Sequence, residues 1–416
     1  MTTTLPTELE KLSVSDLLLS DRGLATQALH ADEAIKDVPD VAPPIHVSTT
    51  FRYPENPEEL VPLRAPDETL TSPPTSKNSG LTTPHVYSRH TAPNTTRLET
   101  LLSTLLHGRV LTYTSGLAAL HAALVFLNPK RIAIGHGYHG CQGVVELHQK
   151  LTNCSILDLD CPADSLGEGD VIHLETPINP TGEAFDIKHY ADKAHSRGAY
   201  LIVDSTFAPP PLQDPFALGA DIVMHAGTKY IGGHSDMLCG ILAVKSVEWQ
   251  KQLLLERLVL GSVMGSLEGW LGVRSLRTLE LRVKRQSTNA TNLVQWLHGQ
   301  LTSPTPNVTN TVLAKIAHAS LQTSEMAWLE KQMPNGYGPV FSIWMKNEEL
   351  ARHLPSRLGL FMHATSLGGV ESLIEWRTMT DSTQDVRLLR ISVGVEDWED
   401  LRDDFEGAFR GLSKLA

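Results

Sequence analysis

The feature that most constrains the fold is an alternation of short apolar runs with helical stretches, beginning near residue 95. The runs are apolar at successive positions, and Gly, Asp or Asn bounds them, which is typical of strands buried on both faces. Strands separated by helices indicate an α/β fold with a largely parallel sheet, whose ligands bind beyond the carboxyl ends of the strands. The expected strands are 131–135, 155–160, 170–175, 200–203, 221–224 and 241–244, and the expected helices are 95–106, 117–127 and 187–197, the last ending before Gly198.

The flanking parts of the chain have other patterns. Residues 1–94 lack sustained periodicity, and the Pro/Ser/Thr-rich stretch 59–84 has the composition of a surface loop or a partner-wrapping arm. Residues 247–301 predict one or two long helices; the strands expected at 339–344 and 388–393 and the helices at 348–358 and 397–412 predict a smaller α+β domain. We therefore predict an arm over 1–94, a large domain over 95–265 and a C-terminal domain over 266–416.

Charge and cysteine content exclude several classes of protein. The chain has 35 Lys and Arg against 47 Asp and Glu, a net charge of −12, without a long basic block. Nucleic acids and anionic membranes both need concentrated positive charge, so we expect neither as a partner. Four cysteines are too few for a disulfide scaffold, and none forms a C-x-x-C pair, which argues against a zinc site, so we expect no metal. Without a long apolar run or a signal-like N-terminus, the chain is expected to be cytoplasmic.

Two polar residues stand just past expected strands. Asp204 follows the run YLIV, where a carboxylate serves as a helix N-cap, a ribose or metal ligand, or the partner of a cofactor cation. Lys229 lies in HAGTKYIGGHSD, after the run DIVM. A single lysine is usually a surface residue, but one beside a Gly-Gly turn at a strand end is a better candidate for an imine-forming amine. Pyridoxal phosphate needs such a lysine and an acid on its ring nitrogen.

The segment TSGLAAL supplies a candidate for binding the phosphate of that cofactor. Ser115 and Gly116 open an apolar helix, and a helix start offers free backbone N–H groups to an anion. Ordinary N-capping explains the same residues equally well.

These segments occur in an order that resembles the Cys/Met-metabolism (transsulfuration) family of pyridoxal-phosphate enzymes. The family includes cystathionine γ-synthase, cystathionine β- and γ-lyases, methionine γ-lyase and acylhomoserine sulfhydrylases. The resemblance runs from about Thr26 to Arg410 through TQALHADE, PPIHVSTTF, YSRHTAPNTTRLE, TSGLAAL, GHGYHG, ETPINPTG, VDSTFAPPPLQDPFALGADIV, TKYIGGHSD, SLGGVESLIE and LRISVGVED. It implies the fold type I architecture, with a mostly parallel, seven-stranded central sheet and an extended N-terminal arm.

The resemblance also implies roles for particular residues. Lys229 is expected to form the Schiff base and to move protons, Asp204 to bond the pyridine nitrogen, and Tyr138 to stack on the ring and assist catalysis. Arg390 is expected to bind the substrate carboxylate, helped by Asn179 and Ser366. The remaining expected contacts to the cofactor are Ser115, Gly116, Leu117 and Thr228, with Asn179 near the ring hydroxyl and Thr365 in the substrate site.

The segment containing Tyr87 and Arg89 is expected to contact a neighbouring subunit. In the family such a Y-x-R segment reaches the phosphate of the neighbouring subunit, so the resemblance implies a homodimer or homotetramer. Exposed side chains in a proline-rich arm are the plain alternative.

Four departures from the family pattern bear on function. Ala226 stands where a serine is usual, Ala92 replaces an asparagine before Pro93, and the stretch 59–84 is longer than usual. Thr365 replaces a glutamate that could meet a distal ammonium group in members acting on cystathionine by γ-chemistry. This last departure leaves β-elimination, simpler thiols or another nucleophile open.

The sequence therefore predicts an enzyme that cleaves or forms a carbon–sulfur bond on a cysteine- or homocysteine-derived amino acid, as cystathionine lyases and synthases do. The alternative is γ-replacement on an O-acyl-L-homoserine with a non-standard thiol or carbon nucleophile. A binding protein without turnover is disfavoured by the intact set of Lys229, Asp204 and Arg390. A nicotinamide-dependent oxidoreductase is disfavoured because no G-x-G-x-x-G turn leads into a helix.

Overall fold

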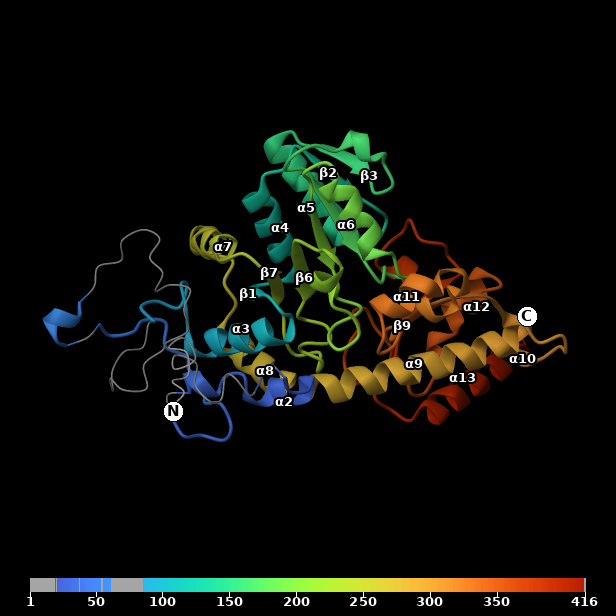
Figure 1. Cartoon of the computed structure of the whole chain (residues 1–416). Coiled ribbons are helices and arrows are strands. Elements are labelled where there is room, and N and C mark those ends of the chain that lie inside the picture. Colours follow the sequence, from blue (N-terminus) through green and yellow to red (C-terminus); the bar gives the residue numbers. More distant parts are fainter. Residues whose placement is uncertain (1–18, 20, 37, 54, 61–84, 415–416) are drawn as a thin grey trace, which may run out of the picture.

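The computed structural model describes residues 19, 21–36, 38–53, 55–60 and 85–414. Most of the stretch 59–84 therefore lies outside the described residues. Two sheets are connected by the long helix α9 (Leu279–Leu301), which runs from below the first sheet to the second (Figure 1).

The first sheet has seven strands in the order β1-β7-β6-β5-β4-β2-β3. Five neighbouring strands are parallel, and β7 is antiparallel to both β1 and β6, so the expected mostly parallel, seven-stranded α/β sheet is confirmed. The strands are β1 (Arg109–Tyr113), β2 (Arg131–Ile134), β3 (Ser155–Asp158), β4 (Val171–Glu175), β5 (Tyr200–Asp204), β6 (Ile222–Ala226) and β7 (Gly240–Val244).

Helices cover both faces of this sheet because successive strand residues are apolar on opposite sides. In β5, Ile202 packs into a core with α4, α5 and α7, whereas Leu201 and Val203 pack into a second core with α3, α6 and α8. The helices are α3 (Pro93–Leu105), α4 (Gly116–Leu127), α5 (His139–Thr152), α6 (Ile187–His195), α7 (Val247–Leu260) and α8 (Ser266–Leu276). The period-two pattern of the apolar runs thus forms both cores.

The second sheet has five strands in the order β10-β11-β12-β9-β8, antiparallel except for the β10–β11 pair. Helix α13 (Trp398–Leu412) and α9 pack beside it and supply residues to its own apolar core. Its strands are β8 (Leu313–Ala317), β9 (Val340–Met345), β10 (Met362–His363), β11 (Leu373–Trp376) and β12 (Leu388–Ser392), with the short helices α10 (Val308–Val312), α11 (Met326–Gln332) and α12 (Glu348–His353).

Several elements differ from the expectations. Residues 247–301 form three helices rather than one or two, because Gly261 adopts a left-handed φ of 70° after α7 and Arg277–Thr278 separates α8 from α9. Strand β1 was not expected. Helix α5 was not expected either, and Tyr138 immediately precedes it.

The N-terminal part lies along the body of the chain. Helix α2 (Leu24–His30) contacts α3 and α9, and the carbonyl of Pro43 accepts a hydrogen bond from Trp270 Nε1 at 2.8 Å. The limits proposed for the arm and the two domains stay predictions. No helix in the described residues has the length and apolar character needed to span a membrane.

Candidate active site

A cavity of about 390 Å³ lies where the carboxyl ends of β4, β5 and β6 meet the start of α4 and the second sheet. It brings together eleven of the predicted site residues: Ser115, Gly116, Leu117, Tyr138, Asn179, Asp204, Thr228, Lys229, Thr365, Ser366 and Arg390. Their segments are far apart in sequence and converge because parallel strands end at one edge of the sheet.

Lys229 lies in the turn that follows β6. Its Nζ donates a hydrogen bond to Ser366 Oγ at 2.8 Å, in the turn that precedes Gly368. Burial, and then the charge of Arg390, lower the pKa of Lys229 to about 8. The amine is therefore a far better base near neutral pH than an exposed lysine.

Gly368 holds the Ser366 turn against the lysine. Its φ is 85°, and a Cβ atom there would lie 2.9 Å from the backbone carbonyl carbon of Lys229. Ser366 also has a left-handed φ, of 74°. This close backbone contact sets where the Ser366 hydroxyl meets the amine.

Asp204 is the last residue of β5 and is 5% exposed. Its Oδ1 accepts hydrogen bonds from the backbone N and Oγ1 of Thr206, at 3.0 and 2.5 Å. Oδ2 makes no hydrogen bond within the described residues. Burial raises the pKa of Asp204, while Thr206 and Lys229 oppose this effect. A buried carboxylate with a free oxygen on a cavity is stabilised by a cation placed there.

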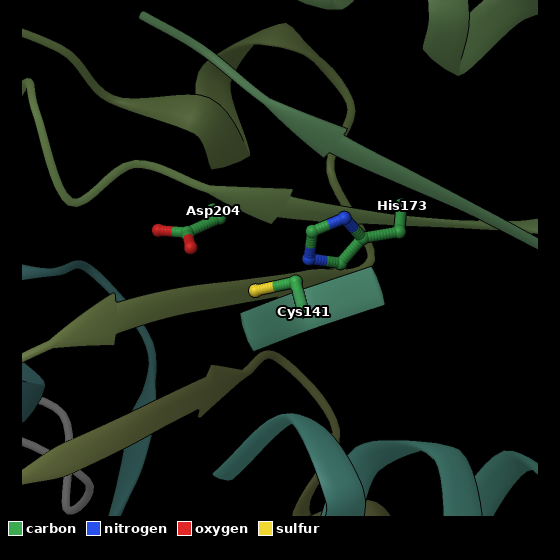
Figure 2. A group of neighbouring side chains, drawn as sticks. All are labelled: Cys141, His173 and Asp204. Carbon is green, nitrogen blue, oxygen red and sulfur yellow. The ribbon is translucent and has the colours of Figure 1, made fainter. Parts of the chain in front are cut away.

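Cys141 and His173 are neighbours of Asp204, and Figure 2 shows the Cys141 sulfur and the His173 ring directed towards Asp204. Their potential ligand atoms all lie within 4.8 Å of one another, although no metal was expected. Burial raises the pKa of the thiol well above its usual value and lowers the pKa of His173 to about 4. A metal here would take the carboxylate that the predicted cofactor nitrogen needs, so we interpret the group as packing beneath Asp204.

The start of α4 forms another wall of the cavity. Ser115 is the N-cap, and its Oγ accepts a hydrogen bond from the backbone N of Ala118 at 3.1 Å. The first N–H groups of a helix have no acceptor within it, so those of Gly116 and Leu117 suit an anion. A Cβ atom on Gly116 would lie 3.1 Å from that of Ala226.

The Thr228 hydroxyl, expected to contact the cofactor, already has hydrogen-bond partners in the backbone. It accepts from the backbone N of Cys239 at 3.0 Å and donates to the carbonyl of Cys239 at 3.3 Å. With Ala226 in the usual serine position, the helix start is the main group suited to a phosphate.

Tyr138 is 38% exposed at the N-terminus of α5 and lines the cavity. Its backbone N donates to Glu175 Oε2 at 2.8 Å, and Asn179 N donates to Glu175 Oε1 at 2.7 Å. A Cβ atom on Gly140 would lie 2.6 Å from the Tyr138 ring, so the ring takes this position only beside a glycine. Glu175 thus fixes two predicted site residues, a role that the motif ETPINPTG did not indicate.

Arg390 lies on β12 and is 5% exposed. Its Nη1 donates to Asn179 Oδ1 at 3.0 Å, and its Nη2 donates to the Ser366 carbonyl at 2.8 Å. Nη2 also donates to Glu375 Oε2 at 2.6 Å, because the antiparallel register of β11 and β12 places Glu375 opposite Arg390. Nε makes no hydrogen bond within the described residues, which leaves an edge of the guanidinium for a carboxylate.

Sequence analysis missed Glu375 and Arg377. Both stand in or beside the apolar strand LIEW, where an unpaired charge is costly. A charge within an apolar strand was therefore the signal that could have pointed to Glu375.

Tyr87 and Arg89 lie away from the cavity of their own chain. Both are exposed, the Arg89 guanidinium lies 5.4 Å from the Tyr87 ring centroid, and Nη1 donates to the carbonyl of Leu258 at 2.9 Å. Their predicted contact with a neighbouring subunit stays a prediction.

The cavity residues fit pyridoxal phosphate. The free carboxylate oxygen of Asp204 suits a pyridinium, the Lys229 amine suits an aldehyde, and the start of α4 suits a phosphate. These three groups come from different elements and share one cavity.

Comparison with known proteins identifies relatives over nearly the whole chain. The family model for Cys/Met metabolism PLP-dependent enzymes matches residues 25–410. Cystathionine beta-lyase of Lactococcus lactis subsp. cremoris is 34% identical over 359 residues, which cover 80% of this chain and 91% of the relative. Cystathionine gamma-synthase of Escherichia coli is 31% identical over 401 residues, which cover 90% of this chain and 94% of the relative.

Solved structures agree in fold. The metB structure from Corynebacterium glutamicum superposes with a TM-score of 0.80 at 28% identity, covering 94% of this chain and 99% of that one. The methionine gamma lyase CalE6 from Micromonospora echinospora superposes with a TM-score of 0.79 at 31% identity, covering 94% and 100%.

Proposed function

The chain belongs to the family of Cys/Met metabolism PLP-dependent enzymes, and from this premise we propose that it binds pyridoxal phosphate through Lys229 and Asp204. It is an enzyme of the transsulfuration type, which cleaves or forms a carbon–sulfur bond as cystathionine lyases and synthases do. We further propose a role in this reaction for each residue of the cavity.

One observation carries the proposal: Lys229, with its lowered pKa, and the free carboxylate oxygen of Asp204 face the same cavity as Arg390. The three groups match the parts of an amino-acid substrate and cofactor. An amine holds the aldehyde, an acid holds the ring nitrogen, and a guanidinium holds the α-carboxylate.

The residues act in a defined order. Arg390, fixed by Asn179, Ser366 and Glu375, binds the α-carboxylate and so orients the substrate Cα–H bond. Lys229 removes the Cα proton, and Ser366 keeps its amine in place. When bound, pyridoxal phosphate supplies the sink for the electrons released from that bond.

Tyr138 is suited to protonate the leaving sulfur. Burial raises the pKa of its phenol, although the nearby Arg377 and Arg390 charges oppose this, so the hydroxyl keeps its proton near neutral pH. A thiolate that leaves can take that proton, and an incoming thiol can return one.

The γ-replacement of an O-acyl-L-homoserine is a second candidate. The observation that favours it is the absence of a free acid near Thr365, within the described lining of the cavity, that could meet a distal ammonium group. Tyr87 and Arg89 are proposed to complete the site of a neighbouring subunit, in a homodimer or homotetramer located in the cytoplasm.

A substrate panel tests the proposal. Cystathionine, cysteine, methionine, O-acetyl-L-homoserine and O-succinyl-L-homoserine are each incubated with the holoenzyme, with and without added thiol, and the products are measured by mass spectrometry. Pyruvate marks β-elimination, 2-oxobutyrate marks γ-elimination, and a new amino acid formed only with thiol marks replacement.

The matched control is Lys229→Ala. We expect it to lose the visible absorption band of the lysine-bound cofactor together with all turnover. If the wild-type protein shows the band but consumes none of the five compounds, the proposed substrate class is wrong.

A further inference from the structure

We propose that Arg377 binds a second carboxylate at the far end of the substrate, so that the enzyme prefers amino acids with an acidic tail. The inference rests on the proposed function, because it names the substrate class held in the same cavity. It concerns a side chain that neither motif nor composition indicated.

Arg377 begins the short 3₁₀ helix η10 (Arg377–Met379), directly after β11. Its side chain lines the cavity with Lys229 and Arg390 and is nearly buried, with the whole residue 3% exposed. Its charge acts on both Tyr138 and Arg390. Arg377 therefore lies close to Arg390, the residue proposed to bind the substrate carboxylate.

The hydrogen bonds of Arg377 are incomplete. Its Nη1 donates to Glu375 Oε2 at 2.6 Å, while Nε is buried without a partner and Nη2 makes no hydrogen bond within the described residues. A guanidinium has five N–H donors, and buried polar groups are nearly always hydrogen-bonded. The uncommitted donors of Arg377 thus call for an acceptor that the described chain does not supply.

Arg282 is an arginine of this chain whose hydrogen bonds are complete. It is also buried, yet all three of its nitrogens have acceptors: Thr278 Oγ1 at 3.1 Å and the carbonyls of Tyr230 and Ser275 at 2.8 and 2.9 Å. Arg377 differs from Arg282 in two ways: it lines a cavity, and most of its N–H donors have no acceptor within the described residues.

The acids around the cavity are already committed. The oxygen of Glu375 that Arg377 contacts also accepts from Arg390, and Thr380 donates to its other oxygen at 2.7 Å. Both oxygens of Glu175 accept backbone N–H groups, and Asp204 is reserved for the ring nitrogen. The acceptor that fits Arg377 is therefore an anion on the ligand.

A carboxylate is the anion that suits a planar guanidinium best in an amino-acid site. Arg377 and Arg390 contact the same carboxylate oxygen, so their guanidiniums are neighbours. A ligand with two carboxylates can place one on each, and the length of the chain between them decides the fit. Cystathionine and O-succinyl-L-homoserine carry such a tail, whereas methionine and O-acetyl-L-homoserine do not.

The kinetic test compares O-succinyl-L-homoserine with O-acetyl-L-homoserine as substrates of the holoenzyme. We expect Arg377→Met to lower kcat/KM for the succinyl ester about 10- to 100-fold more than it lowers kcat/KM for the acetyl ester, the usual effect of losing a charged hydrogen bond. Arg377→Lys should retain part of the preference. The matched control is Arg387→Met, which removes an exposed arginine that does not line the cavity.

A binding test separates this inference from the proposed function. Calorimetry on the holoenzyme compares L-2-aminoadipate with L-norleucine, and L-2-aminopimelate with L-2-aminoheptanoate, none of which has a leaving group. We expect at least one diacid to bind about tenfold more tightly than its neutral counterpart, and Arg377→Met to abolish that difference.

Two outcomes would overturn the inference: equal losses for both esters in Arg377→Met, which would mean that Arg377 only supports Glu375 and Arg390, or an unchanged preference. If neither ester is consumed, the proposed function fails, and the calorimetric difference still decides the inference.

Discussion

At the scale of single residues, burial converts an ordinary lysine into a reactive one. Lys229 is enclosed beside Arg390, and both effects disfavour its protonated form, so its pKa falls to about 8. The carboxylates of Asp204 and Glu375 oppose this shift without cancelling it. The reactive amine is thus a property of the cavity.

This shift predicts a pH dependence for cofactor capture. Only the unprotonated amine attacks an aldehyde, so the rate at which cofactor-free protein takes up pyridoxal phosphate should rise about tenfold per pH unit below pH 8 and level off above it. Stopped-flow absorbance measures the rate. Free Nα-acetyl-lysine is the control, with a midpoint near its ordinary pKa of about 10.4. A midpoint near that value in the protein would contradict the lowered pKa.

At the scale of elements, one tight turn joins the two sheets at the site. The Ser366–Gly368 turn belongs to the segment before β11 and lies against the backbone of Lys229, which follows β6. It also carries the carbonyl that accepts from Arg390. This contact therefore contributes to the position of the amine relative to the guanidinium.

Gly368→Ala tests the turn. The added Cβ would lie 2.9 Å from the backbone of Lys229 at a left-handed φ of 85°, so we expect a loss of about 1–3 kcal/mol in unfolding free energy. Denaturant unfolding measures the loss, and the cofactor absorption band should weaken. Gly407→Ala in α13, where a Cβ meets nothing within 4 Å, should be neutral or stabilising. Equal stability of the two variants would show that the contact is not tight.

At the scale of the whole molecule, the site combines both sheets. The first sheet supplies Asp204 and Lys229, and the second supplies Arg390 and Glu375. Helix α9 spans both parts and keeps their relative position (Figure 1). The exposed Tyr87 and Arg89 are predicted to add a third contribution, from a neighbouring subunit.

Mixed oligomers test that contribution. Lys229→Ala and Arg89→Ala are each expected to lower activity strongly, but hybrids made by co-expression should contain one site with an intact lysine and an intact arm. Activity should therefore reappear in purified hybrids of two tagged variants. Activity no greater than the average of the two parents would place Arg89 outside the neighbouring site.

Much of the site could be predicted from the sequence because its signals are local. The apolar run before Asp204, the small residues around Lys229 and the helix start at Gly116 each lie within a few consecutive residues. Strand β1 and helix α5 were missed, because polar residues interrupt the pattern of β1 and GHGYHG resembles a loop. Arg377 and Glu375 were missed because their roles depend on the pairing of β11 with β12 and on the cavity that Arg377 lines.

The sequence alone determined the α/β alternation and which residues stand at the ends of strands, since side-chain periodicity and strand boundaries are set by neighbouring residues. The tertiary structure decided what those residues do to one another. The antiparallel register of β11 and β12 sets Glu375 opposite Arg390, and the enclosed cavity lowers the pKa of Lys229 and leaves donors of Arg377 free. Hydrogen-bond partners and desolvation depend on elements brought together from distant parts of the chain, which no local pattern encodes.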